Sequence, residues 1–229
     1  MIDLASKMLV NLATVYNLSE NDIRVACGNA KAAGAMGLML MPAHVQVARP
    51  EAAGLTLAAV SGYPAGIQPI DSKAAEIRQA YKLGADEVFA VAHNGYIMDG
   101  DTAKVEEELR GFVAAAAGCP LTLLIELAVL NTQQLLQLCS CAVDCGIRSF
   151  GTSVGFLYNS IFSVTHPEEL AMHVCTTNPE DVFKLRGELG NDVEIVAMDC
   201  HMDAAKARML LEAGADRLCA VDGIAIAKG

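Results

Sequence analysis

The stretch Ile147-Arg148-Ser149-Phe150-Gly151-Thr152-Ser153-Val154-Gly155-Phe156 decides the fold class of this sequence. It is a short apolar run that leads into a glycine loop, and it follows a helical pattern that ends at Cys145-Gly146. Small hydroxyl side chains stand where the predicted strand ends. In strand–loop–helix proteins, side chains at the carboxyl ends of the strands face the ligand. The stretch is therefore a candidate binding site.

The same helix–glycine–strand pattern recurs along the chain, with glycines at 34, 84, 146 and 214 closing helical segments. Strands are predicted at Gly37–Met41, Leu55–Val60, Glu87–Ala92, Leu121–Leu127, Arg148–Ser153, Val193–Met198 and Arg217–Val221. Helices are predicted at Ser72–Leu83, Thr102–Ala116, Thr132–Cys145, Pro179–Leu189 and Asp203–Ala213. Apolar strands that alternate with helices are typical of a parallel sheet covered on both faces, and here they favour a (β/α)8 TIM barrel.

The beginning of the chain fits the barrel less well. Residues 2–18 have the pattern of an amphipathic helix, and Ser19-Glu20-Asn21-Asp22 is predicted to cap a second helix. Only seven strands are then visible, so the first barrel strand is expected to be degenerate, very short or missing. With 229 residues, 53% of them hydrophobic, and no linker, residues 1–229 are predicted to form a single domain.

Composition excludes several classes of function. The net charge of -11 argues against binding to nucleic acid or to an anionic membrane, since both need a basic surface. A signal peptide and an apolar span of 18 residues are both absent, which indicates a cytoplasmic protein. The eight cysteines are spread through apolar segments and are expected to be reduced thiols. Cys141 and Cys145 share a helix face but lack the further ligands of a zinc site.

Residues 150–156 also resemble a known motif. They are similar to the strand of deoxyribose-phosphate aldolases that holds the Schiff-base lysine in a Val-Lys-Thr-Ser-Thr-Gly-Phe-like sequence. Further blocks resemble that family in the same order, at 59–66, 84–88, 124–126 and 215–218. The resemblance runs from about Asp22 to Ile226 and implies a (β/α)8 barrel of the aldolase type.

The resemblance also locates the positions of the family's chemistry. In that family an aspartate relays protons, one lysine forms an imine, and a second lysine lowers the pKa of the first. Here the aspartate position is Phe89 and the imine lysine position is Gly151. The second lysine position is Val196, or Ala197 if the alignment shifts by one. Because these side chains are apolar, we expect either imine-independent lyase chemistry on a small carbonyl or hydroxy metabolite, or a non-catalytic homologue that binds a metabolite or a protein partner.

The family's phosphate pocket is changed as well. Its Gly-Gly pair becomes Asp199-Cys200, and its Ser-Ser pair becomes Val221-Asp222. Backbone amides and hydroxyls bind phosphate, whereas a nearby carboxylate repels it by about 1 kcal/mol or more. We therefore expect an acidic mouth and an unphosphorylated ligand. The residues expected to contact that ligand are Thr152, Ser153, Gly155, Asp222 and Gly223.

Polar side chains that follow other strands are the catalytic candidates, namely His93, Glu126, Asp199 and His201. Two imidazoles with carboxylates could bind a divalent metal, could equally act as an acid–base pair, or could have no chemical role; no metal and no cofactor is assigned. Glu126 could instead only brace the barrel. The lysines, Lys206 among them, are predicted to lie on helices of the outer ring, away from the mouth.

The segment Leu157–Cys175 is an insertion relative to the resembled family. It is too apolar for a free loop, with residues such as Phe162 and Leu170. Long structured loops on the ligand side of a barrel are usually lids or subunit contacts. We expect residues 157–175 to be one or the other, and the chain to be a homo-oligomer.

Overall fold

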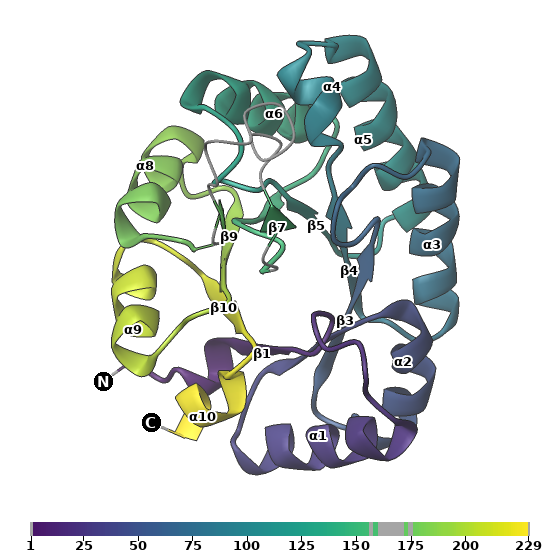
Figure 1. The fold of residues 1–229 in the computed structure, drawn as a ribbon, viewed down its shortest axis with the longest axis vertical. Coiled ribbons are helices and arrows are strands. Elements are labelled where there is room, and N and C mark those ends of the chain that lie inside the picture. Colours follow the sequence, from purple (N-terminus) through teal and green to yellow (C-terminus); the bar gives the residue numbers. More distant parts are fainter. Residues whose placement is uncertain (1, 156–157, 160–171, 174–175, 229) are drawn as a thin grey trace.

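The computed structural model describes residues 2–155, 158–159, 172–173 and 176–228, and in these ranges the chain is a closed barrel of eight parallel strands (Figure 1). The strand order around the barrel is β1-β10-β9-β6-β5-β4-β3-β2. The strands are β1 (Met8–Asn11), β2 (Gly37–Leu40), β3 (Thr56–Ser61), β4 (Glu87–Val91), β5 (Leu121–Leu124), β6 (Ser149–Gly151), β9 (Glu194–Asp199) and β10 (Arg217–Ala220). The predicted (β/α)8 barrel is confirmed.

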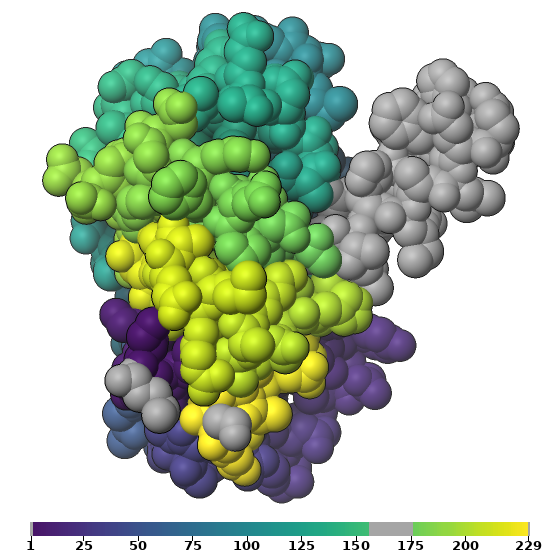
Figure 2. All heavy atoms as spheres, turned by 90° about the vertical axis from the view of Figure 1, so that its left-hand side faces the viewer, coloured from purple at the N-terminus to yellow at the C-terminus, as the bar shows by residue number. Residues whose placement is uncertain are grey.

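Helices form a ring outside the strands, as Figure 1 shows in projection down the barrel. They are α1 (Glu20–Ala32), α2 (Pro42–Ala48), α3 (Ile70–Lys82), α4 (Asn94–Met98), α5 (Thr102–Ala116), α6 (Thr132–Asp144), α8 (Pro179–Leu189), α9 (Ala204–Glu212) and α10 (Gly223–Lys228), with 3-10 turns η1 (Ala5–Lys7) and η2 (Arg49–Glu51). Figure 2 views this ring from the side of α8 and α9, which lie next to each other. None of the described helices has the length and hydropathy needed to span a membrane.

The predicted helix over residues 2–18 is wrong. Met8–Asn11 is instead the first barrel strand, paired with β10 through Met8 and Leu218 and with β2 through Leu9 and Gly37. The strand has four residues, all buried, so it is short, which was one of the alternatives open from the sequence. Pairing on both sides within the barrel overrides the helical pattern, because so short an element is determined by its tertiary neighbours. The cap predicted at Ser19 is present, since Ser19 Oγ accepts a hydrogen bond from the Asp22 amide.

Side chains alternate between the inside of the barrel and the helix layer. The interior cluster includes Phe89, Leu124, Val196 and Met198, whereas Ile195 and Ala197 belong to the cluster between strands and helices. Alternation along β9 therefore directs Asp199 outward, toward the helices. The inserted segment predicted at 157–175 lies mostly outside the described residues, where only the antiparallel pair β7 (Tyr158–Asn159) and β8 (Met172–His173) is described.

Candidate functional site

Four strand ends meet on residues 153–155, which we call the 153–155 loop. The Val154 amide donates a hydrogen bond of 3.0 Å to Glu126 Oε2, and the Tyr63 hydroxyl donates one of 2.6 Å to the Val154 carbonyl. The Gly155 amide donates to Ser153 Oγ at 3.0 Å. Asn11 Nδ2 lies 3.0 Å from the position that a Cβ on Gly155 would occupy. Side chains from the last residue of β1 and from the loops after β3 and β5 thus surround the loop that follows β6, at the carboxyl end of the barrel.

Glu126 has the most unusual backbone of these residues. Its φ is 35°, and among the described non-glycine residues only Ala117 shares a positive φ. The left-handed conformation costs a residue with a side chain about 1–2 kcal/mol, and such strain is often found at functional sites. The Glu126 side chain is only 2% exposed and is oriented by the Val154 amide. A buried carboxylate fixed in this way at a strand end is a strong candidate for proton transfer.

Asn11 and Tyr63 were not among the residues predicted from the sequence. Asn11 is 1% exposed, and its Oδ1 accepts a hydrogen bond of 3.0 Å from the Ala13 amide, so its Nδ2 is the group that lies beside Gly155. Within the described residues no acceptor is bonded to that Nδ2. Asn11 could have been found only by locating β1, and Tyr63 stands in the sequence block 59–66 that was used only for the resemblance.

The barrel interior beneath the loop is filled by apolar side chains. Phe89 and Val196 are completely buried inside the barrel. A Cβ added to Gly151 would approach Leu124 Cδ2 more closely than real Cβ contacts allow, and it would lie 3.1 Å from Met198 Sδ. Space at Gly151 is therefore already occupied by the side chains of neighbouring strands.

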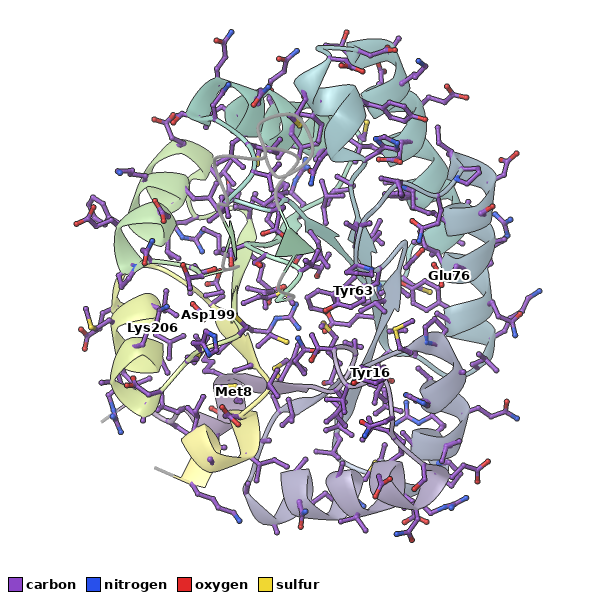
Figure 3. All side chains as sticks on the ribbon, viewed as in Figure 1. Met8, Tyr16, Tyr63, Glu76, Asp199 and Lys206 are labelled. Atoms are coloured by element: carbon purple, nitrogen blue, oxygen red, sulfur yellow. The ribbon has the colours of Figure 1, made fainter. Side chains whose placement is uncertain are left out.

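Asp199 lies at the end of β9 and faces α9, as expected from strand alternation. Its Oδ2 accepts hydrogen bonds from Lys206 Nζ at 2.5 Å and from the Thr177 amide at 2.8 Å, and its Oδ1 accepts one from the His201 amide at 2.7 Å. Figure 3 shows Asp199 and Lys206 side by side between strand and helix. Lys206 lies on α9, and its long side chain reaches back from the first turn of that helix to Asp199 at the end of β9. The predicted distance of the helix lysines from the mouth stays a prediction.

The predicted ligand contacts Thr152, Ser153, Gly155, Asp222 and Gly223 lie at two places. Ser153 and Gly155 belong to the 153–155 loop. Thr152 Oγ1 instead shares a hydrogen bond of 2.6 Å with Thr177 and accepts one from the Met198 amide, so it links β6 to β9. Asp222 is exposed beyond β10, and Gly223 is buried at the start of α10. Contact of these residues with a ligand stays a prediction.

The two candidate histidines have separate surroundings. His93 caps α4: its Nδ1 accepts a hydrogen bond from the Tyr96 amide at 3.3 Å, and its ring stacks on that of Tyr96 at 3.8 Å. The His201 side chain is exposed on the loop before α9. Across the described ranges no group of three or more His, Cys, Asp or Glu side chains is arranged to hold a metal ion. The acid–base role of either imidazole stays a prediction.

Lys73 is a second lysine that reaches a strand end. Its side chain is fully buried, with Nζ 2.5 Å from Glu108 Oε1 and donating to the Gly66 carbonyl at 2.6 Å and the Val91 carbonyl at 3.1 Å. Burial lowers the pKa of Lys73, and the Glu108 carboxylate opposes this shift. Because its ammonium group is enclosed by three acceptors, Lys73 fastens the loop after β3 to β4.

A barrel of this kind, with polar strand ends gathered on one loop, has the architecture of enzymes that bind small molecules at the carboxyl end of the strands. No family model matches the chain. Two curated relatives are the deoxyribose-phosphate aldolase of Methanothermobacter thermautotrophicus, 28% identical over 92% of this chain and 88% of the relative, and deoxyribose-phosphate aldolase 1 of Bacillus licheniformis, 27% identical over 98% and 95%.

Solved structures agree with this likeness. "QR15, an Aldolase" has a TM-score of 0.88 at 23% identity and covers 100% of this chain and 96% of that one. The deoxyribose phosphate aldolase of Aeropyrum pernix, described as a unique tetrameric structure, has a TM-score of 0.79 at 22% identity and covers 98% and 89%. These neighbours show the fold, and the sequence relatives make the chain a homologue of the deoxyribose-phosphate aldolases, as the motifs predicted.

Proposed function

We propose that the chain is an aldolase-like carbon–carbon lyase that acts on a small, unphosphorylated carbonyl or hydroxy compound without forming a lysine imine. The surroundings of Gly151 are the observation that supports this most. The resemblance places the family's imine lysine at Gly151, where Leu124 and Met198 fill the space a side chain would need. An imine requires an amine at the reacting carbon, so the bond would have to be broken in another way.

Glu126 and Asn11 offer such a way. In the proposed cleavage, the Glu126 carboxylate takes the proton of the substrate's β-hydroxyl as that carbon–oxygen bond becomes a carbonyl. The carbon–carbon bond breaks, and its electron pair forms an enolate whose oxygen accepts a hydrogen bond from Asn11 Nδ2. Glu126 then returns the proton to the enolate carbon, which regenerates the carboxylate. Acid–base transfer of this kind contributes roughly 10²–10⁴-fold, and a buried donor stabilises the developing charge.

The experiment is a cleavage assay with 3-hydroxybutanal, an unphosphorylated β-hydroxy aldehyde, in which released acetaldehyde is measured. We expect turnover by the wild-type protein and a loss of about 100-fold or more in Glu126→Gln, from the acid–base contribution given above. Glu107→Gln, an exposed glutamate on α5, is the matched control and should keep full activity. Full activity in Glu126→Gln would remove Glu126 from the mechanism.

The absence of a phosphate requirement is tested by comparing 2-deoxyribose with its 5-phosphate in the same assay. Asp199 should repel a phosphate group less than the sequence suggested, because the Lys206 ammonium group neutralises that carboxylate. Asp222, by contrast, is exposed and has no ion pair in the described part of the chain. We expect no preference for the phosphate ester. A marked preference would show that an anion site survives near these residues.

A non-catalytic homologue that binds a metabolite or a protein partner is the second candidate. It is favoured by the complete burial of apolar Phe89 and Val196 at the other two positions implied by the resemblance. The two candidates separate in one measurement, because a non-catalytic protein would bind the aldehyde or a partner and release no acetaldehyde.

We further propose that the chain assembles as a homo-oligomer in the cytoplasm. Phe183 on α8 and Met209 on α9 are 70% and 53% exposed, and these two helices are neighbours on the outer ring. The Aeropyrum pernix relative is described as a tetramer. No disulfide joins the seven described cysteines, which suits a reducing compartment. Light scattering should give a multiple of 24.1 kDa, and Phe183→Glu should reduce it.

A further inference from the structure

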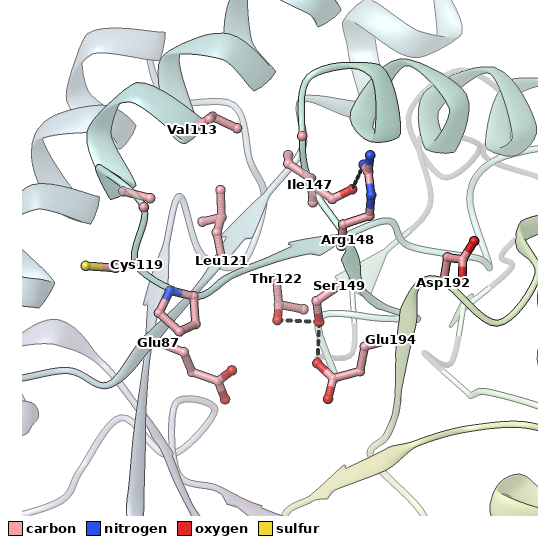
Figure 4. A pocket seen from close by; sticks show the side chains of 14 residues that line it. Glu87, Val113, Cys119, Leu121, Thr122, Ile147, Arg148, Ser149, Asp192 and Glu194 are labelled. Carbon is pink, nitrogen blue, oxygen red and sulfur yellow. Dashed lines mark hydrogen bonds between the residues drawn. The ribbon is translucent and has the colours of Figure 1, made fainter.

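A pocket of about 530 Å³ opens at the amino-terminal end of the barrel, opposite the 153–155 loop (Figure 4). Glu87, Thr122, Ser149 and Glu194 line it, and each is the first or second residue of its strand. The remaining wall comes from the end of α5 and from the loops before β5, β6 and β9. This hollow is separate from the proposed active site, because Phe89 and its apolar neighbours fill the barrel between the two ends.

A chain of hydrogen bonds runs along this end of the barrel. Arg217 donates from Nη1 to Glu87 Oε1 at 2.8 Å and from Nη2 to Glu194 Oε2 at 2.6 Å. Glu194 Oε2 also accepts a hydrogen bond from Ser149 Oγ at 2.8 Å, and Ser149 shares one of 2.8 Å with Thr122. Figure 4 shows the two glutamates with Ser149 and Thr122 on the same side of the pocket.

Two polar atoms of this hydrogen-bond network have no partner among the described residues. Glu87 is 5% exposed, yet only its Oε1 is bonded within the described part of the molecule. Arg217 Nε is buried without a partner among the described residues. A ligand in the pocket could donate a hydrogen bond to Glu87 Oε2, which accepts none from the described residues, and hydrogen bonds to a carboxylate are stronger than those between neutral groups.

Charge selects the class of ligand. Three carboxylates line the pocket, those of Glu87, Asp192 and Glu194, and the single Arg217 bridges two of them. Arg148 also lines the pocket, but its Nη1 is engaged by the carbonyls of Val143 at 2.5 Å and Ile147 at 3.0 Å. Three negative charges against two positive ones favour a cation over an anion.

We propose that this pocket is a second binding site, for a small polyhydroxylated amine. The ammonium group of the ligand would lie against Glu87 and Glu194, and its hydroxyls would pair with the hydroxyls of Ser149 and Thr122. The volume lies within the range of small-molecule pockets, which is about 300–1,000 Å³. The site does not depend on the proposed lyase activity.

The test uses three sugars of equal size and different charge, glucosamine, glucose and gluconate, in amide NMR titrations of the full chain. Glucosamine should shift the amides of Gly118, Cys119, Leu121 and Thr122 and those of Gly146–Ser149, and it should bind at least tenfold more tightly than glucose. Gluconate should cause no shift there. The Glu194 side chain is 36% exposed and is thus less critical for folding than that of Glu87. Glu194→Gln should lower the affinity for glucosamine about tenfold.

Glu107→Gln is the control for removal of one negative charge, and it should leave the glucosamine affinity unchanged. Circular dichroism of both variants separates a lost site from a lost fold, and if Glu194→Gln fails to fold, Asp192→Asn at the exposed rim takes its place. Equal binding of glucosamine and glucose, tighter binding of gluconate, shifts confined to the 153–155 loop, or an unchanged affinity in the folded variant would each overturn the proposal.

Discussion

Replacing Gly151 with alanine tests whether the barrel interior is full at the position of the family's lysine. The added Cβ would overlap Leu124 Cδ2 and lie 3.1 Å from Met198 Sδ. Overpacking a well-packed core costs about 1–3 kcal/mol. Alanine also lowers the conformational entropy of the unfolded chain relative to glycine, which stabilises the folded protein by about 0.4–1 kcal/mol. The expected net loss in the free energy of unfolding, the cost minus the gain, is therefore about 0–2.6 kcal/mol.

Urea denaturation followed by circular dichroism measures this loss, with Gly187→Ala as the matched control. Gly187 lies within α8 and has open space where a Cβ would stand, so alanine there should stabilise the protein by about 0.5–1 kcal/mol. In the double variant Gly151→Ala with Leu124→Ala, the overlap with Leu124 disappears, and the cost of the Gly151 change should shrink. A stabilised Gly151→Ala variant would refute the reasoning, because it would show free space beside Gly151.

Three further predictions concern buried charge and thiols. Burial raises the pKa of Glu87 above its usual 4.5, which means that the folded protein favours the neutral carboxyl. The stability that this gives is fully present below pH 4.5 and is lost as the pH rises through the raised pKa. The free energy of unfolding of wild type minus that of Glu87→Gln should fall over that window, and a flat difference in urea titrations would contradict this. Lys206→Met should cost about 1.5–3 kcal/mol, because buried Asp199 loses a charged donor, whereas Lys206→Arg should cost less in the same assay. Exposed Cys119 should react with a thiol reagent before Cys139, whose pKa burial raises to about 12, and mass spectrometry of labelled peptides showing the reverse order would contradict the burial.

Much of the fold could be predicted because long elements carry strong local patterns. The helices Thr102–Ala116 and Pro179–Leu189 have the bounds that the sequence predicted. β1 could not be predicted, because four residues are too few to show a period and its partners are more than 25 residues away. Asn11, which ends that strand, was missed with it.

The candidate site was less accessible to sequence reasoning. Glu126 was predicted as a polar residue after a strand, but its strained φ of 35° leaves no trace in the sequence. Asp199 was predicted to face the mouth, whereas alternation along β9 turns it toward α9. The reach of Lys206 depends on side-chain length and helix placement, so only the folded chain could reveal that pair.

Borohydride trapping with deoxyribose 5-phosphate tests the central claim most directly. An imine between a lysine and the substrate would be reduced to a stable amine, which mass spectrometry detects on the intact protein and locates in its peptides. A deoxyribose-phosphate aldolase with the lysine in place serves as the positive control. We expect that control to be labelled and this chain to show no adduct. A reduced adduct on any lysine, and on Lys206 above all, would contradict imine-independent chemistry.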